Sequence, residues 1–253
     1  MSEWDSKQYT KFEKERTQPS IDLIGRVGIR PKSILDIGCG PGNSTTQLSA
    51  HFPEAEILGV DSSDNMLAMA HSSYPDMEFR KCSVPDGLDE LGSFDLLFSN
   101  ACLHWIPDHG SLLPKLMNKL NSGGMLAVQI PLTQKAIFYK LLQEHLKSEK
   151  WNRLNIIHNF HNLSPNETYA ILAAISPDVC MWETVYYHVV DSHSAVIDWY
   201  KGSGLKPYLD MLSESEKAEF QSELLLLIRE NIPLQADGKV LLKMPRLFFT
   251  AVK

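Results

Sequence analysis

The sequence from position 34 to position 44 reads Ile34-Leu35-Asp36-Ile37-Gly38-Cys39-Gly40-Pro41-Gly42-Asn43-Ser44, an apolar run that passes directly into a glycine-rich turn. Glycine at positions 38, 40 and 42 lets the backbone turn sharply and approach a ligand closely, because no Cβ stands in the way. A helix that opens after such a turn offers backbone N–H groups that have no partner inside the helix. The pattern predicts a strand–turn–helix unit that binds a nucleotide-like ligand.

Two side chains of this stretch bear on the kind of ligand. A dinucleotide fingerprint would place its third glycine at position 43, where the chain has Asn43. Asp36 stands just before the turn, and the turn itself (residues 37–44) carries no lysine that would neutralise it, which suits a ligand with cationic groups better than a phosphate. S-adenosylmethionine, which carries an α-ammonium and a sulfonium, is such a ligand.

A second acidic residue supports this interpretation. Residues 56–61 read as a short apolar strand that ends in Asp61, about 20 residues after the glycine turn. A carboxylate at this place can accept hydrogen bonds from both hydroxyls of a ribose. The adenosine ribose occurs in both NAD and S-adenosylmethionine, so Asp61 alone does not separate them, but together with Asp36 it favours the methyl donor.

Length and composition limit the class of protein. The chain has 253 residues, 43% of them hydrophobic, and a formal net charge of −7, which argues against a general nucleic-acid binder. No apolar run is long enough to cross a bilayer, and the polar start lacks a signal-peptide core, so we expect a cytoplasmic protein with no membrane partner. The four cysteines are widely spaced, which suits reduced thiols, and we expect no metal site. We expect one main domain and a monomer.

Strand-like and helix-like segments alternate through the first half of the chain. Strands are predicted at 33–37, 56–61, 77–82, 94–99 and 124–130, and helices at 43–51, 63–72 and 109–120. Alternation of this kind calls for a parallel sheet with helices on both faces. With two later strands at 180–190 and 239–252 as an antiparallel pair, the fold class is α/β, a doubly wound, mostly parallel seven-stranded sheet.

Ligands of such sheets bind beyond the carboxyl ends of the strands. We therefore expect the glycine turn and Asp61 to converge with residues that follow the other strands. The predicted cofactor-binding residues are Asp36, Gly38, Gly40, Gly42, Asn43, Asp61, Ser62, Met66, Ser83, Asn100 and Trp105.

Two parts of the chain lie outside the alternation, and they are the expected covers of the site. Residues 1–30 are predicted to be an N-terminal helical cover, in which Pro19 begins a second helix, and residues 31–131 form the cofactor-binding core. A helical lid segment is expected at 132–178, with a helix over 134–150 and a capping box at Ser164. The C-terminal strands are expected within 179–253, with an inserted helical lid at 192–231 whose long helix begins at the capping box of Ser213.

The chain resembles the S-adenosylmethionine-dependent trans-aconitate 2-methyltransferase family, within the class I methyltransferases, over most of its length. The matching motifs are Trp4-Asp5, Glu15-Arg16, the run from Leu35 to Thr45, Gly59-Val60-Asp61-Ser62-Ser63, Trp105-Ile106-Pro107-Asp108-His109, Thr184-Val185-Tyr186-Tyr187-His188, Ile197-Asp198-Trp199, Gly204-Leu205-Lys206-Pro207, Pro233-Leu234-Gln235 and Pro245-Arg246-Leu247-Phe248. The glycine motif marks only the class, whereas the motifs near both ends of the chain are specific to the family.

The resemblance implies methyl transfer to a carboxylate of a small unsaturated tricarboxylic acid, which yields a monomethyl ester and S-adenosylhomocysteine. The chain departs from the family pattern in two places. Ser83 stands where the family has an acidic residue near the adenine, with Asp86 as a substitute further along. Pro131 is followed by Leu132-Thr133 where the family has Asp-Asn, and the match stays weak to about residue 163.

An acceptor with several negative charges needs local positive charge, and guanidinium groups bind carboxylates through paired hydrogen bonds. Arg16 and Arg246 lie in family motifs and are the predicted acceptor-binding arginines. The other predicted substrate-binding residues are Tyr9, Tyr187 and Trp199, with His188 and Lys206 as further candidates. His104, after the fourth strand, is the predicted catalytic residue, as a hydrogen-bond donor to the acceptor, and the ring of Trp105 is expected to shape the cofactor cavity.

Three alternatives stay open at the level of sequence. The acceptor could be another small organic acid or the free carboxylate of a carrier-bound acyl group. An NAD-dependent oxidoreductase would require pyrophosphate to fit beside Asn43. A non-catalytic ligand-binding protein that kept the fold is a third alternative, against which the motifs at both ends of the chain argue.

Overall fold

The computed structural model describes residues 13–155, 161 and 163–253. These residues fall into two compact units, a sheet unit and a helical unit. The sheet unit contains residues 13–131, 246–253 and the described residues of 160–184. The helical unit contains the described residues of 132–159 together with 185–245.

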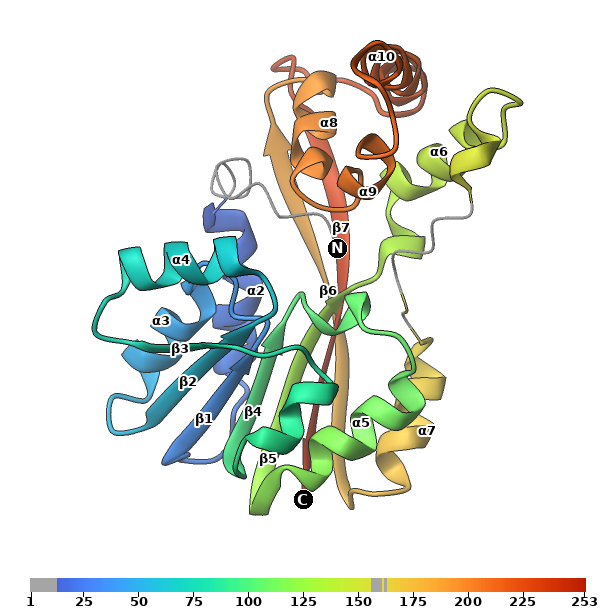
Figure 1. Cartoon of the computed structure of the whole chain (residues 1–253). Coiled ribbons are helices and arrows are strands. Elements are labelled where there is room, and N and C mark those ends of the chain that lie inside the picture. Colours follow the sequence, from blue (N-terminus) through green and yellow to red (C-terminus); the bar gives the residue numbers. More distant parts are fainter. Residues whose placement is uncertain (1–12, 156–160, 162) are drawn as a thin grey trace. The chain divides into compact units, whose positions relative to one another are not determined.

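The elements of the sheet unit follow the predicted alternation (Figure 1). They are α2 (Glu13–Ile24), β1 (Ser33–Ile37), α3 (Asn43–His51), β2 (Glu56–Asp61), α4 (Asp64–Ser73), β3 (Glu78–Lys81), η1 (Asp86–Glu90), β4 (Phe94–Asn100), η2 (Leu103–Trp105), α5 (His109–Asn118), β5 (Leu120–Pro131) and α7 (Pro165–Ala173). The helical unit contains η3 (Thr133–Lys135), α6 (Ile137–His145), η4 (Asn152–Leu154), α8 (His193–Lys201), α9 (Lys206–Leu209) and α10 (Glu214–Asn231). Two long strands, β6 (Asp178–Val190) and β7 (Val240–Val252), contribute residues to both units.

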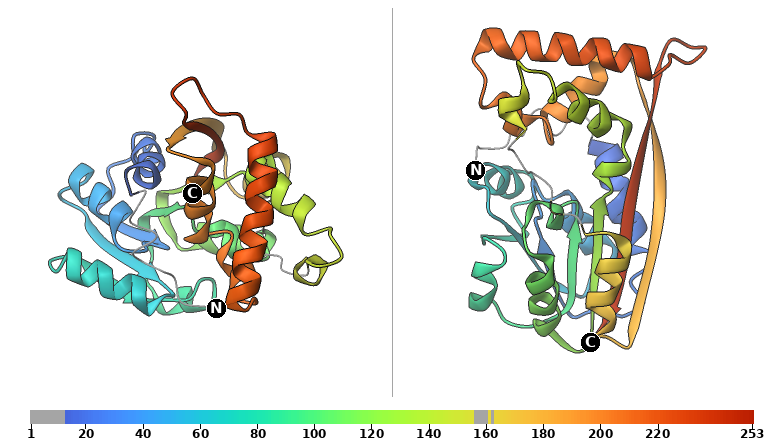
Figure 2. Two further views of the ribbon diagram at one scale, coloured as in Figure 1. Left: turned by 90° about the horizontal axis from the view of Figure 1, so that it is seen from above. Right: turned by 90° about the vertical axis from the view of Figure 1, so that its right-hand side faces the viewer.

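The strands form one seven-stranded sheet in the order β3-β2-β1-β4-β5-β7-β6. Strands β1 to β5 pair in parallel, whereas β7 runs antiparallel to β5. The last two strands lie side by side in Figures 1 and 2. The Ser176 hydroxyl donates to the carbonyl of Val252, and the Trp182 ring stacks on Phe248, so β6 runs antiparallel to β7. The predicted doubly wound, mostly parallel fold is confirmed.

Strand register decides which side chains share a face of this sheet, because residues opposite each other on paired strands point the same way. Asp36 on β1 is paired with Phe98 on β4, and two residues further on Asn100 is paired with Gln129 on β5. Gln129 is in turn opposite Phe248 on β7. Helix α3 covers this face, since two hydroxyls of its first turn bond the carboxylate of Asp36.

The helical unit has a core of its own. The Phe138 ring of α6 stacks on Tyr200 of α8 with centroids 3.6 Å apart, and Phe220, Leu224 and Ile228 of α10 are fully buried in the same cluster. Burial of such side chains stabilises a unit by roughly 1.5–3 kcal/mol each. This core explains why residues far apart in the sequence form one compact group.

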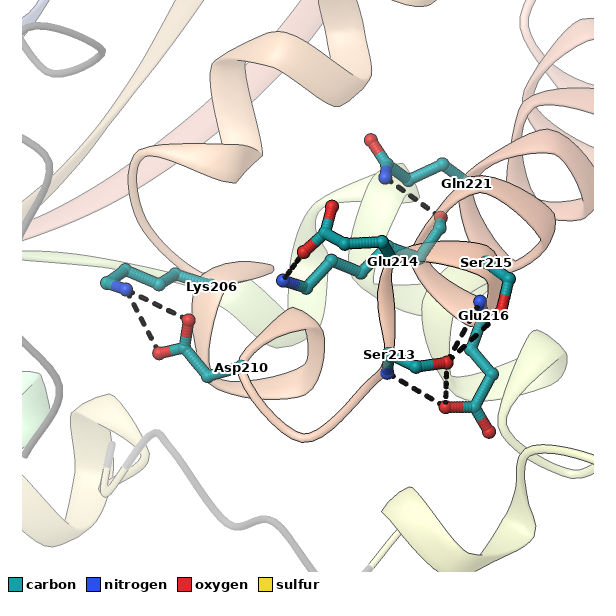
Figure 3. Close-up of polar contacts among 8 residues, drawn as sticks. Lys206, Asp210, Ser213, Glu214, Ser215, Glu216 and Gln221 are labelled. Carbon is teal, nitrogen blue, oxygen red and sulfur yellow. Dashed lines mark hydrogen bonds and ion pairs between the residues drawn. The ribbon is translucent and has the colours of Figure 1, made fainter.

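Both predicted capping boxes are present. The Ser213 hydroxyl accepts the N–H of Glu216, whose carboxylate accepts the N–H of Ser213, so two N–H groups at the start of α10 are satisfied (Figure 3). Ser164 and Glu167 make the same reciprocal pair at the start of α7. The local sequence therefore predicted where these two helices begin.

Two predicted helices have other bounds in the structure. Pro19 does not begin a second helix but lies inside α2, where its ring removes one backbone donor. The Ser20 hydroxyl donates to the Thr17 carbonyl within the same helix, which supplies one local hydrogen bond there. The helix predicted over 134–150 is the shorter α6, which begins at Ile137 after a 3-10 turn.

The predicted division of the chain into a cover, a core and lid segments stays a prediction. Residues 132–178 contribute to both compact units, since α6 belongs to the helical unit whereas α7 packs against α5 in the sheet unit. The role of the 132–178 and 192–231 helices as a lid stays a prediction.

Candidate active site

The glycine turn has the backbone shape that the sequence predicted. Gly38, Gly40 and Gly42 all have positive φ, at 71°, 55° and 94°. A Cβ at Gly38 would collide with the Cys102 side chain, and one at Gly42 would lie 2.7 Å from the Tyr74 ring. A Cβ at Gly40 would meet no described atom within 4 Å. The first and third glycines are thus required by the protein's own packing, whereas the space beside the middle one is open to a ligand.

Asp36 is fully buried under this turn. The hydroxyls of Ser44 and Thr45 both donate to its Oδ2 atom at 2.7 Å, while Oδ1 has no hydrogen-bond partner among the described residues. Burial raises the pKa of Asp36 to about 6, against the lowering effect of the two hydroxyls, and the nearby Asp61 raises it further. A cation beside Oδ1 would satisfy this atom and favour its ionised form.

Asp61 lies at the end of β2 and is tied to the turn by backbone donors. Its Oδ2 accepts the Gly40 N–H at 3.0 Å, and its Oδ1 accepts the Ser63 N–H at 2.9 Å. Burial raises the pKa of Asp61, and these N–H groups oppose the shift. Since each carboxylate oxygen can accept two hydrogen bonds, Asp61 keeps capacity for the two hydroxyls of a ribose.

The two carboxylates together make this part of the site rich in acceptors and negative potential. Each is buried enough for its pKa to be raised, and the charge of Asp61 contributes to the shift at Asp36. A pyrophosphate placed here would add like charge to two desolvated carboxylates, which is unfavourable. A ligand with ammonium and sulfonium groups would relieve the repulsion, so the electrostatics fit S-adenosylmethionine rather than a dinucleotide.

The structure brings most of the other predicted cofactor-binding residues to the same edge of the sheet. Asn43 begins α3, Met66 is buried on α4, and Asn100 ends β4, where its Oδ1 has no partner among the described residues. Ser62 and Ser83 are exposed, after β2 and β3 respectively. Asp86, the possible substitute for the family's acidic residue, opens η1 and is also exposed. Their contacts with the cofactor stay predictions.

His104 and Trp105 follow β4 in the short helix η2, with ring centroids 4.9 Å apart. His104 is buried, and its pKa is held well below the usual range, first by desolvation and then by electrostatic interaction with Arg246 and His109. His104 is therefore neutral near pH 7. A neutral imidazole can still donate one hydrogen bond, as the predicted role requires.

The same electrostatic effect shows that Arg246 lies near His104, although the two are 142 positions apart in the sequence. Arg246 is half-buried on β7 opposite Pro131, the last residue of β5. Arg16 is half-buried on α2, which packs against β5 and α3. Both predicted acceptor-binding arginines thus belong to the sheet unit, whereas Tyr9 lies outside the described residues.

The remaining predicted substrate residues belong to the helical unit. The ring of His188 is buried and stacks on Trp199 with centroids 4.9 Å apart. Tyr187 is 59% exposed and lies on the other face of β6, because side chains alternate along a strand. The structure therefore brings Trp199 together with His188 and not with Tyr187.

Lys206, at the start of α9, pairs with the residue that caps the end of this helix. Its Nζ donates to both carboxylate oxygens of Asp210 at 3.0 Å (Figure 3). The Asp210 carboxylate therefore already balances the charge of Lys206. This makes Lys206 a weaker candidate for binding the acceptor.

Sequence reasoning missed several residues that shape the site. The hydroxyls of Ser44 and Thr45 donate hydrogen bonds to Asp36. Their position in the first turn of the helix that follows the strand could have indicated this role. Ala101, directly after Asn100, has φ of 53°, a conformation that costs a non-glycine residue roughly 1–2 kcal/mol. Gln129 on β5 has a fully buried amide side chain. The sequence could have indicated its importance, because Gln129 is the one polar residue of the run from Met125 to Ile130.

Among the described residues no group of three or more His, Cys, Asp or Glu side chains could hold a metal ion. The helices that the structure describes include none with the length and apolar character needed to cross a bilayer.

Comparison with known proteins defines the class. Residues 34–124 match a methyltransferase domain family. The fold resembles the crystal structure of the YcgJ protein from Bacillus subtilis, with a TM-score of 0.61, 17% identity and coverage of 93% of this chain and 98% of that one. It also resembles the plantazolicin methyltransferase BpumL in complex with a triazolic desmethylPZN analogue and S-adenosylhomocysteine, with a TM-score of 0.54, 19% identity and coverage of 98% and 90%. Fold and site define a class I methyltransferase whose cofactor is S-adenosylmethionine.

Full-length relatives show the family. The chain is 41% identical to a trans-aconitate 2-methyltransferase of Methylobacterium nodulans, over 99% of this chain and 98% of the relative. It is 38% identical to the enzyme of the same name from Escherichia coli, again over 99% and 98%. The chain belongs to the trans-aconitate 2-methyltransferase family, which confirms the resemblance seen in the sequence.

The glycine turn supports a first prediction. We expect Gly40→Ala to fold, with a cost of roughly 1–2 kcal/mol for a side chain at positive φ, and to weaken S-adenosylmethionine binding on the order of tenfold or more, since the methyl group enters the open space. Gly38→Ala should instead fail to accumulate as folded protein, because its Cβ collides with Cys102. Isothermal calorimetry and thermal unfolding distinguish these results, and an unchanged dissociation constant for Gly40→Ala would contradict the assignment.

Proposed function

We propose that the protein transfers the methyl group of S-adenosylmethionine to a carboxylate of trans-aconitate and so forms the monomethyl ester. The observation that carries this proposal is the match to trans-aconitate 2-methyltransferases over practically the whole chain. The described site supports it with a buried and a half-buried carboxylate at the glycine turn and a half-buried arginine near the end of β5.

The cofactor end of the site is the part around the glycine turn. Asp36 would take up a cationic group of the ligand, Asp61 would hold the ribose, and Gly40 would leave room for the close approach of the ligand to the backbone. The bound cofactor supplies an electrophilic methyl group on a sulfonium.

The acceptor end needs donors rather than a base. A carboxylate with a reference pKa near 4 is already ionised at neutral pH, so the nucleophile requires no proton removal. Rate acceleration then rests on placement, with the reacting atoms held about 3–3.5 Å apart and water excluded. In this proposal Arg16 and Arg246 bind the carboxylates that do not react, and neutral His104 donates one hydrogen bond to the acceptor.

The residues that follow Pro131 favour a second candidate acceptor. The chain has Leu132-Thr133 after Pro131, where the family carries Asp-Asn, and this position directly follows the strand pair of Pro131 and Arg246. A change of polarity there would alter the acceptor rather than the cofactor. The second candidate is therefore methyl transfer to another small carboxylic acid or to a carrier-bound acyl carboxylate.

The experiment that tests the proposal is incubation with methyl-labelled S-adenosylmethionine and a panel of trans-aconitate, cis-aconitate, citrate and isocitrate. We expect base-labile methyl ester to form fastest with trans-aconitate. Ester formation with another acid alone would establish the second candidate. Ester with none of the acids, in a protein that binds S-adenosylmethionine, would overturn the proposed function.

Removal of the two arginines gives a further prediction. Arg16→Ala and Arg246→Ala should each lower kcat/KM for trans-aconitate by about 10- to 100-fold, the effect of losing a hydrogen bond to a charged group, while S-adenosylmethionine affinity stays near wild type. Arg80→Ala is the matched control, because Arg80 is an exposed arginine of the same unit paired with Glu78. Unchanged acceptor KM and turnover in both variants would disprove the assignment.

A further inference from the structure

The amide side chain of Gln129 stands out among the described residues. It is fully buried in β5, with 0% of its surface exposed, and neither Oε1 nor Nε2 has a hydrogen-bond partner in the part of the chain that the structure describes. Its neighbours along the strand, Val128 and Ile130, are buried and apolar. A leucine would fill this place without leaving polar atoms unpaired.

Unpaired atoms of this kind are costly, and buried polar groups in native proteins nearly always have a partner. A buried amide that lacks both its donor and its acceptor partner is therefore a group that a bound molecule completes. The place of Gln129 in the sheet indicates which molecule this is.

Strand register puts Gln129 in a row of polar side chains across one face of the sheet. Asp36 on β1 shares this face with Asn100 on β4, which is directly paired with Gln129 on β5. Two residues further along, Pro131 is opposite Arg246 on β7, so the guanidinium side chain projects from the same face. Gln129 thus lies between Asn100 and Arg246.

The chemical character of the row changes along its length. At the β1 end, the buried Asp36 and the half-buried Asp61 supply carboxylate acceptors that suit the cationic groups of the cofactor. At the β7 end, Arg246 offers only donors, which suit a carboxylate. Gln129 is on β5, on the β7 side of Asn100, and its Nε2 adds two N–H donors to this end.

We propose that Gln129 is an acceptor-binding residue, whose Nε2 donates a hydrogen bond to a carboxylate of the acid being methylated. This inference rests on the proposed function and adds to it a specificity-determining residue. An ordered water that enters with the acid can donate to Oε1, so the bound state satisfies both atoms of the amide.

The test compares Gln129→Leu and Gln129→Met with wild type, as ligand-free protein and in turnover. Both variants should lower kcat/KM for the acid by about 10- to 100-fold, mainly through KM, and leave the S-adenosylmethionine dissociation constant within about twofold of wild type. The ligand-free variants should also unfold about 2–8 °C higher than wild type, because the unpaired amide is gone. Loss of acceptor binding with a gain in stability is a result that a merely structural amide would not produce.

Thr250→Val is the matched control, since Thr250 is a buried polar residue on the same face, two residues further from the carboxyl end of β5. It should leave the acceptor KM unchanged. Wild-type KM in Gln129→Leu or Gln129→Met would overturn the inference, and so would a lower melting temperature with weakened cofactor binding. If wild type binds S-adenosylmethionine but esterifies no acid, the proposed function fails; a working wild type with unaffected Gln129 variants overturns only the role of Gln129.

Discussion

Replacement of Asp61 by alanine is expected to weaken binding of both S-adenosylmethionine and S-adenosylhomocysteine by about 10- to 150-fold, which corresponds to roughly 1.5–3 kcal/mol. The ribose that Asp61 is predicted to hold is common to both ligands, so both should lose a similar factor. The carboxylate also accepts the N–H groups of Gly40 and Ser63, so its removal loosens the turn as well. Calorimetric titration of the two ligands measures the effect directly.

Asp64→Ala provides the control for Asp61→Ala. Asp64 is three residues away and also acidic, but its carboxylate pairs with Lys81 at the surface, 2.6 Å from Nζ. We expect this variant to bind both ligands as wild type does. Wild-type affinity in Asp61→Ala would remove the basis for the predicted cofactor site.

Replacement of Asp36 by asparagine should make the ligand-free protein more stable at pH 8 and the complex weaker. The pKa of Asp36 is about 6 in the folded protein, against 3.8 as its ordinary value, so the buried ionised form costs roughly 3 kcal/mol at pH 8. Asparagine has no charge and can still accept the hydroxyls of Ser44 and Thr45. After allowance for the new buried amide donor we expect a gain of about 1–3 kcal/mol, or about 2–12 °C in melting temperature.

The pH dependence of this gain follows from the sign of the shift. A folded-state pKa above the unfolded value means that the protonated group contributes stability below about pH 4, and that this contribution is lost as the pH rises through about 6. The difference between Asp36→Asn and wild type should therefore vanish near pH 4 and reach its full size above pH 6. Thermal unfolding at a series of pH values checks this, and a difference independent of pH would refute the assignment.

Asp95 supplies the opposite case on the same sheet. Hydrogen bonds from Asn121 and from the backbone of Lys32 and Ser33 hold the pKa of this carboxyl below its usual range. Asp95→Asn should therefore destabilise the protein at neutral pH. The pair of variants separates the effect of a buried charge from that of a lost hydrogen-bond acceptor.

The affinity for the cofactor should also depend on the protonation of Asp36. If Asp36 must be ionised to hold a cation, the affinity of wild type for S-adenosylmethionine falls by about tenfold for each pH unit below 6. Asp36→Asn should lack this dependence and bind weakly throughout.

Acidic and basic side chains of the site lie on different strands of the sheet. The chain as a whole is acidic, with a formal net charge of −7, yet the acceptor must be an anion. Carboxylates are concentrated at the glycine turn, whereas Arg246 projects from β7, where its charge adds to the desolvation that lowers the pKa of His104. We expect this separation of the two kinds of charge to let one site attract a cationic cofactor and an anionic acid.

The sequence by itself determined the features that depend on local chemistry. The strand–turn–helix at 34–44, the alternation of strands and helices, and the starts of α7 and α10 at Ser164 and Ser213 were all predictable. Positive φ requires glycine, a helix start requires a cap, and a buried strand requires an apolar run, and each requirement is visible within a dozen residues. The family resemblance rests on the same linear motifs.

Only the tertiary structure decided which of these features meet. The spacing of residues in the sequence does not show that Cys102 fills the space under Gly38 or that Arg246 lies near His104. It also does not show that Tyr187 faces away from Trp199. The place of Gln129 between Asn100 and Arg246 is likewise a matter of register, since a slip of one residue would turn every side chain of β5 to the other face. Register joins segments more than a hundred residues apart through packing and hydrogen bonds between strands, and no local pattern in the sequence specifies those pairings.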